Sequence, residues 1–201
     1  AERLGLGEPT RPGALWLHAV SLGESRAAEP LIQALRAARP GLRLLLTSGT
    51  ATGRETAAAL LRDGDVQRWL PFDTPGAVRR FLRRHQPAIG VLMETEVWPN
   101  LVAACEARGI PLALANARLS DKSLAGALRL APLSRPAYRA LAAVWAQTAD
   151  DAGRLARAGA QLDFVGGVGR ETDNTPAPFA IARVIDKRQR GAPCLGARAA
   201  E

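Results

Sequence analysis

The stretch "LWLHAVSLGES" at residues 15–25 decides the fold. Its apolar run predicts a buried strand, and a helix is expected to begin at the following Ser21-Leu22-Gly23-Glu24. A carboxylate is costly to bury, so Glu24 is expected at the solvated end of the strand. Glu24 is therefore either a helix-capping residue or a base held at a ligand site.

The same alternation of apolar runs and amphipathic segments continues to about residue 165. Strands are expected at 15–20, 42–47, 66–70, 88–92, 111–115, 143–147 and 162–165, and helices at 24–38, 52–62, 74–85, 97–108, 132–141 and 149–158. Strands separated by single helices predict βαβ units and a parallel sheet that is covered on both faces. With right-handed crossovers, residues 15–165 are expected to form a Rossmann-like, doubly wound α/β domain.

The composition narrows the possible partners. The chain has 201 residues, of which 47% are hydrophobic, and it contains no apolar run of about 18 residues that could span a membrane. Two cysteines far apart in the sequence and two histidines make a metal site unexpected. The net charge of +8, carried almost entirely by arginine, favours phosphate or an anionic lipid surface. Aromatic residues make up only 4% of the chain, so nucleic acid is not an expected partner.

Open parallel sheets bind their ligands beyond the carboxyl ends of the strands. Five strand-to-helix junctions are therefore expected on one edge of the sheet, and they are rich in Gly, Pro, hydroxyl and acidic residues. They are "AVSLGES" (19–25), "TSGTATG" (47–53), "LPFDTPG" (70–76), "METEVWPN" (93–100) and "ANARLSDKS" (115–123).

Two of these junctions allow an ordinary structural interpretation. "TSGTATG" could present backbone N–H groups to an anion or could be a capped turn, and it is neither a Walker A motif nor GxGxxG. In "DTPG", Asp73 or Thr74 is expected to cap a helix that starts at Pro75. The arginines that follow surround one helix and are either a solvated face or a basic surface beside an anionic lipid; they are Arg79, Arg80, Arg83 and Arg84.

The junction "METEVWPN" is less ordinary, because Glu94 and Glu96 both follow a buried strand. In an extended segment the i, i+2 spacing would direct both side chains to the same side. Helix capping accounts for one acid, whereas two acids before Trp98-Pro99-Asn100 indicate a ligand or a specific loop network.

Taken together, in this order and spacing, the five junctions closely resemble those of the 3-deoxy-D-manno-octulosonic acid (Kdo) transferases. The resemblance covers residues 2–165 and implies the N-terminal, acceptor-binding half of a two-domain GT-B glycosyltransferase. Such enzymes transfer Kdo from CMP-Kdo to a lipid A precursor with inversion and without a cofactor. The implied location is the cytoplasmic face of the bacterial inner membrane, with residues 1–14 leading in from an anchor that is missing here.

The resemblance also implies roles for individual residues. Glu24 would be the general base that deprotonates the acceptor hydroxyl, and Glu94 would stabilise the transition state. The implied acceptor-binding residues are Ser21, Gly23, Thr47, Ser48, Gly49, Thr52, Gly53, Glu96 and Arg118.

The sequence departs from the family pattern after residue 165. Where family members have a "TGNLK"-like turn, this chain reads "VGGVGRE": Gly166 is kept, Gly169 stands at the lysine position, and Arg170 is an imperfect substitute. Residues 166–201 resemble nothing in the family and are expected to be a disordered tail in place of the donor domain. The alternative function is therefore an inactive fragment that binds the acceptor, an anionic lipid or a sugar phosphate.

Overall fold

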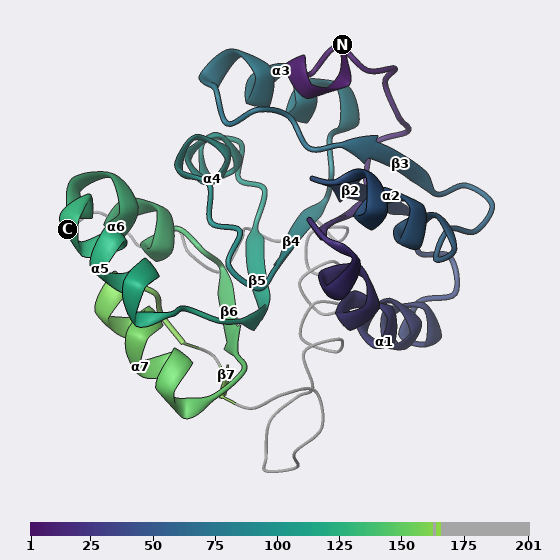
Figure 1. Ribbon diagram of the computed structural model, residues 1–201. Coiled ribbons are helices and arrows are strands. Elements are labelled where there is room, and N and C mark those ends of the chain that lie inside the picture. The colour runs from purple at the N-terminus through teal and green to yellow at the C-terminus, as the bar shows by residue number, and fades with distance from the viewer. Residues whose placement is uncertain (163, 166–201) are drawn as a thin grey trace.

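The computed structural model of the protein describes residues 1–162 and, for Phe164–Val165, the backbone (Figure 1). In this part of the chain, seven strands form one parallel sheet with the order β3-β2-β1-β4-β5-β6-β7. The strands are β1 (Leu15–His18), β2 (Leu44–Ser48), β3 (Val66–Trp69), β4 (Ile89–Met93), β5 (Leu112–Ala117), β6 (Ala143–Ala146) and β7 (Phe164–Val165). The predicted Rossmann-like parallel sheet is confirmed.

Helices cover both faces of this sheet, as Figure 1 shows. The helices are α1 (Leu22–Ala38), α2 (Ala51–Ala58), α3 (Pro75–His85), α4 (Pro99–Glu106), α5 (Asp121–Arg129), α6 (Ala131–Arg139) and α7 (Ala149–Ala158), with a 3-10 turn η1 (Glu2–Leu4). Helices α1 and α2 pack on one face and α3 to α7 on the other, so each face has its own apolar cluster. None of the helices in the described part of the chain is long and apolar enough to cross a membrane.

The central strands are close-packed around Trp16 of β1. Its ring lies 5.2 Å from that of Phe81 in α3, measured between centroids. On the neighbouring strand, a Cβ atom at Gly90 would lie 2.9 Å from Trp16 Cε3 and 2.3 Å from Leu112 Cδ2. Only glycine therefore leaves room for the indole at the centre of the sheet.

The N-terminal segment adds contacts at the β3 edge. The Trp69 N–H donates to Glu2 Oε2 over 3.0 Å, and the Arg3 guanidinium lies 4.6 Å from the centroid of the Trp69 ring. Arg3 Nη2 also donates to the carbonyl of Gly49, at 2.6 Å. Residues before β1 therefore pack on the sheet edge and on the loop after β2.

One helix was not predicted. Residues 115–123 were expected to form a loop after a strand, but Ser120 caps α5 by accepting the Ser123 N–H at 3.1 Å. Of α5 only Leu124 is buried, so the segment lacks the apolar stripe by which a helix is recognised in a sequence.

The strand order places a topological switch point between β1 and β4, because β2 lies on one side of this pair and β5 on the other. All the strands are parallel, so the five junctions share the edge formed by the carboxyl ends, as predicted. Glu24 follows β1 and Glu94 follows β4. The two predicted catalytic carboxylates therefore flank the crevice in which open α/β sheets bind ligands.

Candidate active site

Glu24 lies in the first turn of α1, and both its carboxylate oxygens accept hydrogen bonds. Ser21, the N-cap residue, accepts the Glu24 N–H at 3.3 Å and donates its hydroxyl to Glu24 Oε1 at 3.0 Å. The Val20 N–H donates to Glu24 Oε2 at 2.8 Å. Glu24 is only 8% exposed, so its carboxylate is fixed in one orientation at the end of β1. The N-cap residue is thus Ser21, and Glu24 takes part in the cap from the third helical position; its role as a base stays a prediction, for which the same contacts would hold the carboxylate in place.

The loop "TSGTATG" supports this arrangement through Val20. The carbonyl of Val20 accepts the N–H groups of Gly49 and Thr50 at 3.3 and 3.1 Å, and the Thr50 hydroxyl at 2.9 Å. A Cβ atom at Gly49 would lie 2.7 Å from Val20 Cγ1, and one at Gly53 would lie 2.5 Å from the Val20 carbonyl oxygen. The capped-turn interpretation therefore explains Gly49 and Gly53, which permit close packing against the loop that carries Glu24.

The residues predicted to bind the acceptor at the end of β2 fall into two groups. Thr47 and Ser48 are fully buried, whereas Thr52 is exposed on α2. Thr47 Oγ1 accepts the Trp16 indole N–H at 2.8 Å, and His18 Nδ1 lies 3.0 Å from the same oxygen. The side chains of Thr47 and Ser48 thus lie inside the domain, and the acceptor contacts predicted for them stay predictions.

His18 is the buried partner of Thr47. Burial lowers the pKa of His18 to about 4, although the hydrogen bond with the Thr47 carbonyl acts in the opposite direction. The imidazole is therefore neutral at pH 7. His18 Nδ1 lies 3.0 Å from that carbonyl. Since a carbonyl can only accept, the tautomer with hydrogen on Nδ1 gives a hydrogen bond between the imidazole and the Thr47 carbonyl.

Glu94 has a left-handed backbone conformation, with φ at 58°. Its N–H donates to the carbonyl of Ala115 at 3.0 Å, and its carbonyl accepts the Arg118 N–H at 3.3 Å. Asn116, between these two partners, also has a positive φ, of 52°. The predicted extended geometry of Glu94 and Glu96 is therefore wrong, because pairing with the end of β5 turns the chain at Glu94.

The acidic residues at this edge influence one another. Burial raises the pKa of Glu94, the charge of Glu24 raises it further, and Arg118 opposes the shift. Burial also raises the pKa of Glu96, with smaller effects in the same direction from Glu24 and Glu94 and an opposing hydrogen bond from Trp98. The Trp98 indole N–H donates to Glu96 Oε2 at 2.7 Å. The structure thus brings Glu24, Glu94, Glu96 and Arg118 together, although they follow three different strands.

These carboxylates are not arranged as a metal centre. Within the residues that the structure describes, no group of three or more His, Cys, Asp or Glu side chains could hold a metal ion. Gly23 and Arg118 are exposed beside the carboxylates, and Ser21 is half-buried. The edge therefore offers a fixed carboxylate, a second carboxyl group that resists ionisation, and a cation.

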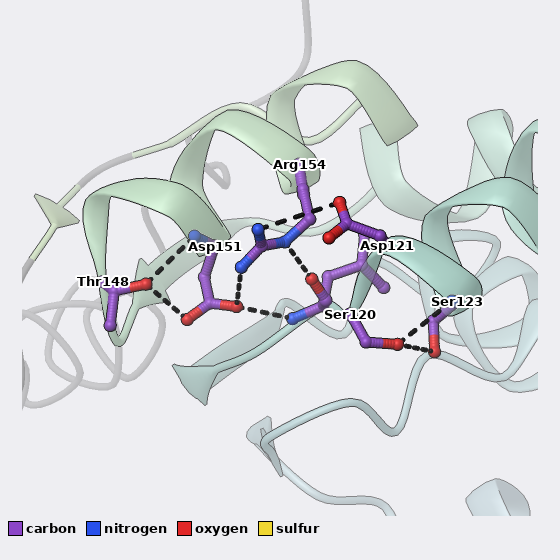
Figure 2. A network of polar contacts seen from close by, with 7 residues as sticks. Ser120, Asp121, Ser123, Thr148, Asp151 and Arg154 are labelled. Carbon is purple, nitrogen blue, oxygen red and sulfur yellow. Dashed lines mark hydrogen bonds and ion pairs between the residues drawn. The ribbon is translucent and has the colours of Figure 1, made fainter.

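A network that the sequence analysis missed holds the loop carrying Arg118 (Figure 2). Asp151 Oδ1 accepts the Leu119 N–H at 3.0 Å and Arg154 Nη2 at 3.1 Å, while Arg154 Nε donates to the Leu119 carbonyl. Thr148, the N-cap residue of α7, donates its hydroxyl to Asp151 Oδ2 at 2.6 Å. Both backbone groups of Leu119 are therefore fixed. The spacing of Thr148 and Asp151, which matches that of Ser21 and Glu24, could have revealed the cap of α7 but not its contacts with Leu119.

Burial alone would favour protonation of Asp151. Hydrogen bonds from Thr148, from the Leu119 N–H and from Arg154, together with the charge of Arg154, instead hold the pKa of Asp151 below its usual value. Asp151 is therefore an ionised structural residue.

Asp73 joins two of the junctions. Thr74 is the N-cap residue of α3, as one of the two alternatives predicted, but its side chain makes no capping hydrogen bond. Asp73 instead accepts the backbone N–H groups of Asn100 and Leu101, at 3.1 and 2.8 Å, and so caps α4. The loop after β3 is thereby tied to the loop that contains Glu94.

The fold places this chain in the class of Rossmann-like α/β domains. It is similar to part of a UDP-N-acetylglucosamine 2-epimerase, with a TM-score of 0.55 and 12% identity over 80% of this chain and 49% of that one. It is also similar to the UDP-GlcNAc 2-epimerase from Neisseria meningitidis, with a TM-score of 0.52 and 16% identity over 79% of this chain and 46% of that one. At such low identities these similarities show the fold alone.

The sequence then gives the family. The family described as "3-Deoxy-D-manno-octulosonic-acid transferase (kdotransferase)" matches residues 1–169, and the chain belongs to this family. It is 52% identical over 158 residues to the 3-deoxy-D-manno-octulosonic acid transferase of Bordetella pertussis, covering 76% of this chain and 36% of the relative. It is 41% identical over 112 residues to that of Haemophilus influenzae, covering 56% of this chain and 26% of the relative.

The chain thus spans about a third, or less, of the length of the relatives it matches. The predicted substitution of Gly169 for the family's lysine, the neighbouring Gly166 and Arg170, and the predicted tail at 166–201 lie outside the described residues.

Proposed function

We propose that this chain is the acceptor-binding part of a glycosyltransferase that transfers Kdo from CMP-Kdo to a lipid A precursor in lipopolysaccharide biosynthesis. Its membership of the Kdo transferase family supports this role. The observation that carries the proposal is the pairing of Glu24 with Glu94 across the switch point between β1 and β4. The catalytic roles of Glu24 and Glu94 are part of the proposal and go beyond this observation.

In the proposed reaction Glu24 is the general base. It takes the proton from the acceptor hydroxyl as that oxygen attacks the anomeric carbon of Kdo. The bond from this carbon to the phosphate oxygen of CMP breaks, CMP leaves, and the configuration is inverted. Contacts from Ser21 and Val20 use one lone pair on each oxygen of Glu24, so further lone pairs remain for the substrate hydroxyl.

Glu94 is proposed to stabilise the transition state. Burial and the charge of Glu24 raise its pKa, so Glu94 takes up a proton more readily than an exposed glutamate does, and the protonated group could donate a hydrogen bond where negative charge develops. Arg118 is exposed beside it and is proposed to contact an anionic group of the acceptor. The other proposed acceptor contacts are Ser21, Gly23, Thr52 and Glu96.

Three large apolar side chains near these loops support a lipid acceptor. Leu22, Phe72 and Trp98 are 38%, 52% and 40% exposed and belong to the junctions after β1, β3 and β4. Exposed apolar groups around a polar site fit an amphiphilic substrate at a membrane surface. The site is therefore proposed to face anionic lipids on the cytoplasmic side of the inner membrane.

A chimera tests the proposal. The matching 158 residues of the Bordetella pertussis enzyme are replaced by those of this chain, and transfer of radiolabelled Kdo from CMP-Kdo to a lipid A precursor is measured. Transfer by the chimera is expected. A folded chimera that binds the lipid A precursor but transfers no Kdo would contradict the catalytic assignment.

The 201-residue chain by itself is the second arm of this experiment. It is expected to bind the acceptor without transferring Kdo, since family resemblance places the donor in another domain. Product formed by this chain above a blank without protein would show that it also binds the donor.

A further inference from the structure

Two adjoining hollows lie on the α3–α4 side of the domain. The first has a volume of about 350 Å³ and is lined by Gly76, Arg79, Arg80, Arg83 and Arg108; we call it the arginine hollow. The second has a volume of about 590 Å³ and shares Arg83 and Arg108 with the first. The rest of its wall is mostly apolar and is made of Pro12, Gly13, Leu82, Gln86, Pro87, Ala88 and Ile110.

The second hollow lies away from the candidate active site, and the arginine hollow runs along α3 toward that hollow from Gly76, in the junction after β3. Gly13 and Ala88 precede β1 and β4, so the second hollow is at the edge formed by the amino ends of the strands. Glu24 and Glu94 are at the opposite edge. A ligand here would therefore be separate from the proposed acceptor, and the inference does not depend on the proposed reaction.

The arginine hollow concentrates positive charge without an acid. No carboxylate is among its lining residues, and within the described residues Arg79, Arg83 and Arg108 make no ion pair. Arg80 has a structural contact, since its Nε donates to the Leu4 carbonyl at 2.8 Å. Arg108 Nη1 likewise donates to the Ala104 carbonyl at 3.3 Å, and the side chains of Arg79, Arg83 and Arg108 are exposed.

Helix electrostatics account for only part of this arrangement. Arg83 lies in the last turn of α3, where a cation is favoured by the helix dipole. Arg79 lies in the first half of α3 and has no such benefit. Arg79 and Arg83 are also four residues apart on one helix, a spacing at which like charges destabilise it. A bound anion would offset this repulsion.

We propose that the arginine hollow binds the phosphate group of an anionic amphiphile and that the adjoining hollow takes its apolar part. Guanidinium groups match the oxygen atoms of phosphate and donate paired hydrogen bonds to them, so several arginines around one hollow favour phosphate. Both volumes fall in the range of small-molecule sites. The apolar wall beside Arg83 and Arg108 distinguishes this ligand from inorganic phosphate.

The test compares three probes on the 201-residue chain: inorganic phosphate, octyl phosphate, and phosphatidylcholine vesicles with or without phosphatidylglycerol. Octyl phosphate is expected to bind more tightly than inorganic phosphate by calorimetry. Flotation with the vesicles that contain phosphatidylglycerol would identify a lipid headgroup as a source of the phosphate, and binding of octyl phosphate without flotation would identify a soluble ligand.

Variants with matched charge separate a specific site from general attraction. Arg83→Gln with Arg108→Gln should weaken octyl phosphate binding roughly tenfold or more, since charge-assisted hydrogen bonds are lost. Arg62→Gln with Arg157→Gln removes the same charge from exposed positions outside the hollow and should change binding little. Arg83→Lys with Arg108→Lys should give an intermediate loss, because it keeps the charge but not the paired donors.

Three results would overturn the proposal. They are equal weakening by the two glutamine pairs, equal affinity for inorganic and octyl phosphate, and no binding of any probe. Circular dichroism of each variant establishes that the fold is kept, and all the substituted arginines are exposed, so folding is expected to be unaffected.

Discussion

Two helices of this domain begin with the same arrangement of side chains. In α1 the N-cap Ser21 accepts the N–H of Glu24 and donates to its carboxylate. In α7 the N-cap Thr148 does the same for Asp151. In each case a backbone N–H from a loop at the carboxyl edge donates to the second carboxylate oxygen. The local chemistry of the two acids is thus nearly identical.

The surroundings of the Glu24 and Asp151 carboxylates differ. Asp151 faces Arg154, which neutralises it and lowers its pKa together with the hydrogen bonds from Thr148 and Leu119. Glu24 instead raises the pKa values of Glu94 and Glu96 through its charge. A cationic partner lowers the pKa of a carboxyl group, whereas neighbouring acids raise the pKa values of one another, and such a cluster is a candidate ligand site. The environment, and not the capping motif, separates a structural acid from a candidate catalytic one.

The largest expected effect follows from Glu24→Gln in the chimera. Turnover should fall by about 10²–10⁴-fold, the usual contribution of a general base, because the amide cannot accept the proton. Stability should change little, since the amide oxygen still accepts the Val20 N–H. Radiolabelled transfer and thermal unfolding measure the two effects. Glu29→Gln, an exposed change on the same helix, is the control, and near-normal turnover of Glu24→Gln would remove Glu24 from the role.

The second prediction concerns the structural acid. Asp151→Asn should lower the free energy of unfolding at pH 7 by about 2 kcal/mol, because Arg154 and the Leu119 N–H lose a charged acceptor. The pKa of Asp151 is lower in the folded protein than its usual value of 3.8. Its contribution to the stability of the fold is therefore complete above that value and is lost as the pH falls through the lower, folded pKa. Urea unfolding should therefore show a difference between the two proteins that shrinks below about pH 4.

The N-cap hydroxyls of Ser21 in α1 and Thr148 in α7 allow the same kind of substitution to be compared in the two helices. Ser21→Ala and Thr148→Ala should each destabilise the domain by about 1 kcal/mol, the usual cost of losing an N-cap. Ser21→Ala should also reduce turnover of the chimera, since Ser21 orients the Glu24 carboxylate, whereas Thr148→Ala should affect turnover less. Equal effects of the two changes on turnover would show that the environment does not separate the two motifs.

The smallest expected effect is a gain in stability. Burial and Glu24 raise the folded pKa of Glu94, so its contribution to stability is present below the usual value of 4.5 and is lost as the pH rises through the folded value. Glu94→Gln should therefore raise Tm at pH 7, by about 2 °C, and should not raise it at pH 4. Glu106→Gln, an exposed change on α4, should leave Tm unchanged. A lower Tm for Glu94→Gln at pH 7 would show that burial and the charge of Glu24 do not disfavour the ionised form of Glu94.

The order and type of most elements could be predicted from the sequence, because most strands are short apolar runs and most helices have an apolar stripe, whereas β3 (VQRW) alternates apolar and polar residues less regularly. That pattern also placed Glu24, Glu94 and Arg118 on one edge. Helix α5 was missed because only Leu124 of it is buried. The left-handed turn at Glu94 was missed because it depends on hydrogen bonds with Ala115 on the neighbouring strand and with Arg118 just after that strand.

The sequence by itself determined the βαβ order, the edge that carries the five junctions, the family, and a helix that starts beside Glu24. These follow from periodicity and from contacts between residues close together in the chain. Only the tertiary structure decided that Thr47 is buried, that Asp151 accepts the Leu119 N–H, and that the charge of Glu24 acts on Glu94. The physical reason is that burial and charge depend on groups brought together from distant parts of the chain, and such groups leave no periodic signal in the sequence.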